Sequence, residues 1–204
     1  MKDVRKLLAQ ALVEICENKP LDHVTVTEIT QRAMLTRQVF YRHFVDKYDL
    51  AKSIHLEDYY GALDSLDIGN DCGAKMWGKV GQVWFDIIKA KPKFYQNIYR
   101  SNSDGEFQRI MRTYITNFYM GIVQHQCVDS ADPDILFVIH LYLLGATEKI
   151  HEWILSGAKM PIEDLNRRLY LAMPETIRNL IIFNEVSGDT AKRIARAAYP
   201  VEEK

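Results

Sequence analysis

Apolar residues recur at helical spacing along almost the whole chain of 204 residues. Between Val4 and Ile15 they stand three or four positions apart, which is the pattern of an amphipathic helix with one buried face. This helix is expected to end near Lys19-Pro20, because proline disfavours helical geometry in the residue before it. No segment alternates apolar and polar positions with the two-residue period of a β-strand. The pattern therefore predicts an all-α protein.

Polar residues at helix-start positions divide the N-terminal part into short helices. Thr25 and Glu28 have the spacing of a capping box, in which each side chain bonds the backbone N–H of the other residue. Thr36 is the predicted N-cap of a third helix, which ends near Phe44. Asp46 then caps a longer fourth helix.

A turn-rich stretch, DIGNDCG at 67–73, separates these helices from a larger helical part. Further helices are predicted there at 74–91, 92–100, 105–128, 134–156, 161–183 and 188–198. We therefore expect three parts: a three-helix head at 1–47, a connecting helix at 48–66 and a body at 67–204.

The third helix has one aromatic and one polar face. At about 100° per residue, Phe40 and Phe44 share one arc, where they hold the helix against the head. The opposite arc carries Arg37, Gln38, Tyr41 and Arg42. With the short link Met34-Leu35-Thr36 before it, this arrangement matches a helix-turn-helix. The ordinary alternative is a solvated helix face with ordinary caps, since short helix-turn-helix shapes also occur in proteins that do not bind DNA.

The polar face carries the donors that double-stranded DNA accepts. Arg37 and Gln38 lie in the first turn, which normally meets base edges, and they can pair bidentately with guanine and adenine. The predicted DNA-binding set is Thr25, Thr27, Thr36, Arg37, Gln38, Tyr41, Arg42, His43 and Lys47. Of these, Tyr41, His43, Lys47, Thr25 and Thr27 suit phosphate contacts. The net charge of -1 does not oppose this prediction, because nucleic-acid affinity depends on where the cations lie.

Residues 24–50 resemble the DNA-binding head of the TetR family of bacterial transcriptional regulators. The resemblance rests on Thr25-Val26, Ile29, Ala33 and the stretch FYRHFVDKYDL at 40–50, whose spacing matches the family pattern in full. Met34 stands where the family usually has a turn glycine. The turn is therefore expected either to avoid a positive φ or to absorb a small strain.

This resemblance implies a homodimeric, ligand-responsive regulator, most simply a repressor that binds a palindromic operator and is released by a small effector. The stretch TRQVFYRHFVDKYDL at 36–50 is also similar to regulators of dihydroxyacetone kinase operons. That similarity implies an alternative: a coactivator on the same fold that acts through a protein partner, with little operator binding of its own.

The body is expected to hold the effector and the dimer contact. Aromatic residues are dense between 77 and 153, where they form either ordinary core or an apolar pocket with a few polar groups. The predicted pocket residues are Trp84, Tyr114, Phe118 and His140. The segment 134–155 is apolar nearly all round, so it is either a dimer seam, shared with 161–183, or the buried central helix of a monomer. Pro174 is expected to kink or restart the later helix.

Motifs for other chemistry are sparse. Glu148 and His151 form only half of a di-iron motif, and His125 with Cys127 supplies two ligands, so neither pair makes a metal site alone. We predict no catalytic residues and no cofactor; a small helical enzyme or carrier is the remaining alternative. Cys16 lies on the apolar stripe of the first helix and is expected to be a buried thiol.

The N-terminal sequence is not typical of a signal peptide, since it carries an acid and no long apolar run. The longest uncharged apolar stretch is well short of the roughly 20 residues that span a bilayer. We therefore expect a cytoplasmic protein.

Overall fold

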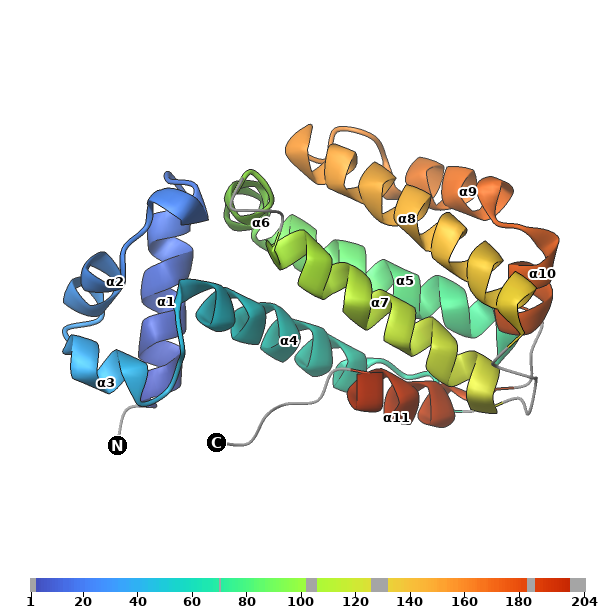
Figure 1. Ribbon diagram of the computed structural model, residues 1–204, viewed down its shortest axis with the longest axis horizontal. Helices are drawn as coiled ribbons and strands as arrows, with labels where there is room; N and C mark the ends of the chain where they lie inside the picture. The colour runs from blue at the N-terminus through green and yellow to red at the C-terminus, as the bar shows by residue number, and fades with distance from the viewer. Residues whose placement is uncertain (1–2, 70, 102–105, 126–131, 183–185, 199–204) are drawn as a thin grey trace.

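A computed structural model describes residues 3–69, 71–101, 106–125, 132–182 and 186–198. Across these ranges every regular element is a helix (Figure 1). Residues 105, 126–128 and 183, for which the sequence predicts helix, lie outside the described residues, as does Cys127. The all-α prediction is confirmed, and none of the described helices is both long and apolar enough to cross a membrane.

The N-terminal helices form a group at one end of the molecule (Figure 1). Their bounds are α1 Val4–Cys16, the short 3-10 helix η1 Leu21–His23, α2 Val26–Arg32 and α3 Arg37–Tyr41. Helix α4, Lys47–Ser65, leads from this group along the body. The body helices are α5 Gly73–Ala90, α6 Pro92–Tyr99, α7 Glu106–His125, α8 Pro133–Leu155, α9 Ile162–Ala172, α10 Glu175–Ile177, the π-helical turn η2 Arg178–Ile182 and α11 Gly188–Ala198.

Caps predicted from the sequence fix the starts of the short helices. Thr25 and Glu28 form the predicted capping box: the Thr25 hydroxyl accepts from the Glu28 N–H at 3.2 Å, and the Glu28 carboxylate accepts from the Thr25 N–H at 2.8 Å. Thr36 caps α3 through the Val39 N–H, and Asp46 caps α4. Helix α3 ends at Tyr41, earlier than predicted, because the chain turns there toward the cap of α4.

The two aromatics of α3 are buried in the head as predicted. Phe40 is fully buried, Phe44 is 2% exposed, and their ring centroids are 5.9 Å apart. Met34, in the turn before α3, has a φ of 56° and is 93% exposed. The turn therefore keeps the left-handed geometry of the usual glycine and absorbs the strain of a side chain there.

Close backbone contacts and a proline shape the far end of the body. A Cβ on Gly188 would lie 2.0 Å from the Ile68 carbonyl oxygen, so only glycine allows α11 to begin against the link between α4 and α5. Of the two outcomes expected at Pro174, a kink or a restart of the helix, the structure shows the restart. Helix α9 ends at Ala172, and α10 begins one residue after the proline.

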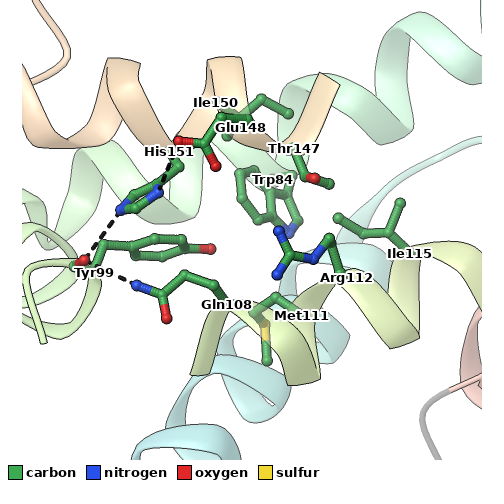
Figure 2. A pocket seen from close by; sticks show the side chains of 10 residues that line it. All are labelled: Trp84, Tyr99, Gln108, Met111, Arg112, Ile115, Thr147, Glu148, Ile150 and His151. Atoms are coloured by element: carbon green, nitrogen blue, oxygen red, sulfur yellow. Dashed lines mark hydrogen bonds and ion pairs between the residues drawn. The ribbon is translucent and has the colours of Figure 1, made fainter. Parts of the chain in front are cut away.

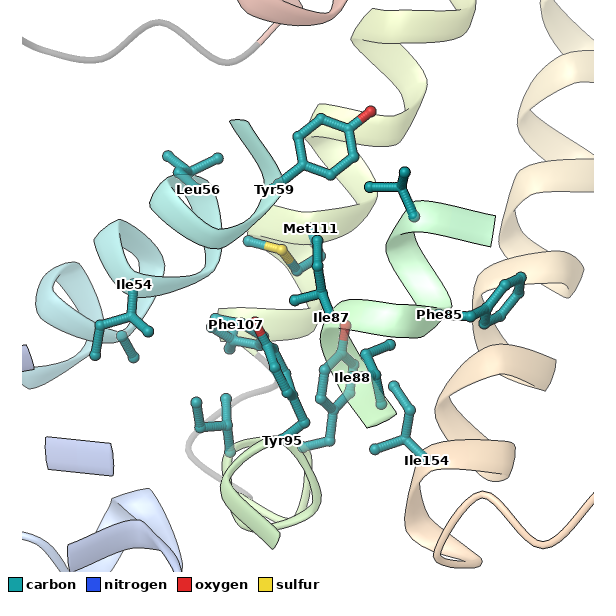
Figure 3. Packing of buried hydrophobic residues seen from close by; sticks show 14 of the residues in the cluster. Ile54, Leu56, Tyr59, Phe85, Ile87, Ile88, Tyr95, Phe107, Met111 and Ile154 are labelled. Atoms are coloured by element: carbon teal, nitrogen blue, oxygen red, sulfur yellow. The ribbon is translucent and has the colours of Figure 1, made fainter. Parts of the chain in front are cut away.

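The buried hydrophobic residues of the head and the body belong to one cluster. Figure 3 shows the part of this cluster where α4 meets the body helices. Ile54 and Tyr59 of α4 face the body helices, while Phe107 and Met111 of α7 fill the space between α4 and α5. Cys16 is fully buried, as predicted, and burial raises the pKa of its thiol to about 12.

Candidate DNA-reading face and ligand cavity

The outer face of α3 is free in this chain. Arg37, Gln38, Tyr41 and Arg42 are exposed. Arg37 lies 5.9 Å from the centre of the Tyr41 ring, within the range of a cation–π contact. No other described residue holds the Arg37 or Gln38 side chain by a hydrogen bond or an ion pair. Phe40 and Phe44 thus orient a short helix whose polar side chains point away from the core.

The threonines around α2 and α3 differ in what their hydroxyls can still do. Thr25 and Thr27 are exposed at the start of α2. The Thr25 hydroxyl already donates to Glu28 at 2.9 Å, so a phosphate would have to compete with that bond. Thr36 uses its oxygen as an acceptor in the α3 cap, which leaves its O–H available to donate. His43 is half-buried beside them.

Lys47 turns toward the head, not away from it. Its ammonium group donates to the backbone carbonyls of Asp22 at 2.7 Å and Val24 at 2.9 Å. Partial burial lowers the pKa of Lys47, against the attraction of the Asp22 carboxylate. Two of its three donors therefore hold the start of α4 to the loop before α2. The phosphate contact predicted from the sequence stays a prediction, with one donor left to make it.

The body encloses an apolar chamber of about 450 Å³. Its lining comes from α4, α5, α7, α8 and α9 and consists of Tyr59, Gly78, Val80, Gly81, Trp84, Phe85, Ile115, Phe118, Tyr119, Tyr142, Ile150, Asn166, Arg167, Leu169, Tyr170 and Met173. Its volume lies within the range of small-molecule sites.

Two of the four pocket residues proposed from the sequence line this chamber. Trp84 and Phe118 contribute to its wall. Tyr114 is half-buried outside the lining, and His140 is exposed on α8. The inward face of α4 supplies Tyr59, which the sequence marked only as part of a connecting helix. Helical periodicity shows which residues face inward, but not which of them border empty space.

A second hollow, here called the polar recess, lies between α6, α7 and α8. Figure 2 shows the smaller pocket that adjoins it and shares five of its lining residues. The lining of the polar recess consists of Tyr99, Arg100, Ser101, Gln108, Arg112, Glu148, His151 and Leu155. The Tyr99 carbonyl accepts from the Gln108 side-chain amide at 3.0 Å, and His151 Nε2 lies 3.1 Å from the same oxygen. A carbonyl only accepts, so Nε2 bears the hydrogen and Nδ1 faces Glu148 at 3.7 Å. The Glu148/His151 pair therefore borders this hollow.

Helix α4 connects the head to the wall of the apolar chamber. His55, which is 1% exposed, packs edge-on against Trp84 with ring centroids 5.9 Å apart. Its Nδ1 lies 3.2 Å from the Tyr95 hydroxyl, which itself donates to Asp58 at 3.3 Å. Burial, with the nearby Lys91 cation, lowers the pKa of His55 to about 4. One helix thus carries both the bonds of Lys47 to the head and the contacts of His55 and Tyr59 with the chamber.

Helix α6 makes a second connection to the head. The Asn97 side chain, 8% exposed, donates to the Cys16 carbonyl at the end of α1 at 2.8 Å. Ser101 also bonds the Asp22 carboxylate, next to the loop that Lys47 holds. Within the described ranges, no three His, Cys, Asp or Glu side chains lie close enough together to hold a metal ion.

A helix-turn-helix head, joined through one continuous helix to a larger helical body, is the architecture of a DNA-binding transcriptional regulator. Residues 8–54 match the family model of bacterial regulatory proteins of the tetR family, and residues 76–174 match a transcriptional regulator C-terminal region, TetR_C_8. The chain belongs to the TetR family of transcriptional regulators, whose members bind DNA and are not enzymes.

Solved structures support the same fold. The dihydroxyacetone kinase operon activator DhaS shares 18% identity with this chain at a TM-score of 0.56, covering 89% of this chain and 99% of its own. A tetR-family regulator from Streptomyces coelicolor, also at 18% identity and a TM-score of 0.56, covers 96% of this chain and 92% of its own.

One curated sequence from a different class also matches. A probable G-protein coupled receptor, Mth-like 7 from Drosophila melanogaster, is 24% identical over 133 residues, or 64% of this chain. The chain spans about a quarter of the length of that protein, at 25%. Identity at this level over so small a part carries no activity over to this chain.

Proposed function

We propose that the chain is a ligand-responsive repressor that binds a palindromic operator as a homodimer and is released when a small effector enters the body. In this proposal residues 1–47 read DNA, 48–66 connect, and 67–204 bind the effector and the second copy. The observation that carries it is the course of α4, which holds the head through Lys47 and lines the apolar chamber through Tyr59.

The outer face of α8 supports the second copy. Phe137, Leu141 and Leu144 are 67%, 60% and 53% exposed, and their spacing places them on one face of the helix. A Cβ added to Gly145, on the same side, would meet no atom within 4 Å, so a partner helix can approach closely there. Leu171 of α9 is 65% exposed as well. Contiguous large apolar side chains of this kind mark an interaction surface.

Two heads in one dimer supply the regulatory step. They read a palindrome when their recognition helices lie about one helical turn, roughly 34 Å, apart. An effector that fits the chamber better in one arrangement of α4 shifts the population toward that arrangement. If that arrangement misplaces the heads, the operator is released without any contact between effector and DNA.

The test begins with a library of random DNA duplexes selected on the purified chain. Arg37→Ala and Gln38→Ala should each cost about 1–3 kcal/mol at the selected site and relax its sequence preference. Arg196→Ala removes the same charge from α11, far from the reading face, and serves as the matched control. Selection of no site, or equal losses in all three variants, would contradict the proposal.

The alternative is a coactivator that acts through a protein partner. One observation favours it: two predicted phosphate contacts, the Thr25 hydroxyl and Lys47, already bond inside the head. A coactivator would show weak DNA binding without a preferred site, and Arg37→Ala would impair capture of the partner protein instead. Salt-dependent binding to one selected site favours the repressor.

A further inference from the structure

The apolar chamber and the polar recess lie on either side of a small pocket and share lining residues with it; the three together are here called the passage. The small pocket is a narrow neck of about 20 Å³. Trp84, Ile115 and Ile150 line both the chamber and the neck. On its other side the neck adjoins the polar recess, whose volume is about 440 Å³. The residues that line both are Tyr99, Gln108, Arg112, Glu148 and His151. Beyond the neck the lining changes from aromatic and aliphatic to polar, so the passage has an apolar end and a polar end.

The neck limits what can occupy both ends at once. Its volume is close to the space that a single water molecule needs. A ring system fills the chamber without reaching the recess. A linear alkyl chain is thin enough to run between Trp84 and Ile115, with the flexible side chain of Met111 moving aside.

Arg112 gives the polar end its chemical preference. Its half-buried guanidinium group points into the recess, between Trp84 and Gln108 (Figure 2). No described residue pairs with it by a hydrogen bond or a salt bridge. A guanidinium group presents a planar fork of donors that matches a carboxylate. Gln108 and His151 border the same space and are held in place by the Tyr99 carbonyl.

We propose that the effector is a linear amphiphile with a single negative charge: a carboxylate head on Arg112 and an alkyl chain that passes the neck into the apolar chamber. This inference rests on the proposed function, in which the body takes an effector. Glu148, whose side chain is 54% exposed, lies at the edge of the recess and disfavours a head with two negative charges. A cationic head would meet Arg112 at close range.

The passage has two other arginines, and both are poorer partners. Arg100, which follows the last residue of α6, lines the polar recess but is exposed. Arg167 lines the mouth of the chamber, but its side chain is 60% exposed and it pairs with Asp164 at 3.4 Å. Water screens a group so exposed, and its charge already has a partner. Of the three arginines, Arg112 is the partly buried one, and its guanidinium group has no hydrogen-bond or ion-pair partner within the described residues. Its hydrogen bonds to an anion are therefore expected to be the strongest of the three.

A carboxylate bound in the polar recess also lies next to the residues that connect the body to the DNA-binding head. The Tyr99 carbonyl, which orders Gln108 and His151, ends helix α6. Two residues earlier, Asn97 of the same helix holds the Cys16 carbonyl of α1. The carboxylate therefore acts on α6 while the alkyl chain acts on Tyr59 of α4, and these are the two helices that hold the head.

The experiment measures binding of octanoate, decanoate and dodecanoate to the full chain by calorimetry, below their micelle concentrations. Decanol and decyltrimethylammonium, with equal chain length, are the head-group controls. Decanoate should bind about tenfold to a hundredfold more tightly than decanol, as expected for a hydrogen bond to a charged group. Affinity should rise from octanoate to dodecanoate. Equal binding of acid and alcohol, or tighter binding of the ammonium compound, overturns the proposal.

Variants then show where the carboxylate of the ligand binds. Arg112→Gln should remove the preference for decanoate over decanol, while Arg167→Gln, the matched control, should keep it. If Arg167→Gln alone lost the preference for decanoate, the carboxylate would bind at the chamber end of the passage and not at Arg112, which would contradict the proposal. The measurements on the unmodified chain decide the ligand class even if Arg112→Gln does not fold.

These results separate the inference from the proposed function. A chain that binds a selected operator, but binds none of the carboxylates better than decanol, refutes the ligand class and leaves the repressor. A chain that binds decanoate through Arg112 but selects no DNA site refutes the repressor and leaves the ligand class. Decanoate should also weaken operator binding in the unmodified chain and not in Arg112→Gln.

Discussion

At the scale of single residues, His55 is the buried titratable group whose setting is most unusual. It is 1% exposed, and its ring lies against Trp84, Tyr95 and Phe107 from three different body helices. Desolvation and the Lys91 cation favour the neutral imidazole. The folded chain therefore excludes a proton that the unfolded chain accepts readily.

This exclusion predicts a pH dependence of stability. The pKa of His55 falls from 6.5 to about 4 on folding, so its contribution is fully present above pH 6.5. The contribution is lost as the pH drops toward 4, where the unfolded chain binds the extra proton, and amounts to about 3 kcal/mol. Urea unfolding between these pH values should show a steeper decline for the unmodified chain than for His55→Leu. Parallel curves would contradict the assignment.

At the scale of elements, the sequence predicts what local chemistry decides. The capping box of Thr25 and Glu28 and the inward face of Phe40 and Phe44 follow from spacing alone, and the structure confirms them. The sequence does not decide between the two conformations expected at Met34, because the φ of this residue depends on how the turn packs between two helices.

Tertiary contacts set the limits of that prediction. The phosphate contact that the sequence predicts for Lys47 stays a prediction. Residue spacing does not predict that the ammonium group of Lys47 bonds two carbonyls of a loop more than twenty residues earlier. Arg112 and His151 share one recess although they come from different helices. Periodicity assigns a residue to a helix face, but it does not say which helix lies opposite. The recess was therefore not predictable, whereas the helical body was.

The connection of α4 to the head gives a prediction at the same scale. Lys47→Met should lower the free energy of unfolding by about 1.5–3 kcal/mol, because two carbonyls lose a charged donor. Lys52→Met, on the same helix, breaks only a partly exposed pair with Asp49 and should change it by less than about 1 kcal/mol. Chemical denaturation measures both. Lys47→Met could instead leave the stability unchanged and lower the salt slope of DNA binding by about one. That result would assign Lys47 to a phosphate contact.

At the scale of the whole molecule, bonds from α4 and from the end of α6, where Ser101 also bonds Asp22, connect the head to the body. Helix α4 holds the head through Lys47, and helix α6 holds it through Asn97. Both helices border the passage in the body, α4 at the apolar chamber and α6 at the polar recess. A ligand of the proposed class, if it fills the passage, would contact both helices together. Such contacts can turn the head as a unit while leaving its DNA-reading face intact.

In the proposed dimer, the exposed face of α8 is the contact that brings two heads together. Leu144→Glu places a charge at one end of the apolar stripe that also carries Phe137 and Leu141. In a dimer that charge is buried without a partner, which costs several kcal/mol, and in a monomer it is simply hydrated. The dissociation constant of the dimer should therefore rise by about a hundredfold or more. Light scattering across a dilution series measures it.

Operator binding should weaken with dimerisation in Leu144→Glu, because one head gains no help from a second in reaching its half-site. Gln124→Glu, on the exposed side of α7, adds the same charge away from the stripe and should leave both properties unchanged. Helix α3 is distant from the substitution, so the remaining single-head binding should keep its dependence on Arg37. If Leu144→Glu stays dimeric at the same dilutions as the unmodified chain, the dimer contact does not lie on this face of α8. If Leu144→Glu is monomeric and still binds the operator normally, the proposal that two heads bind one palindrome is wrong.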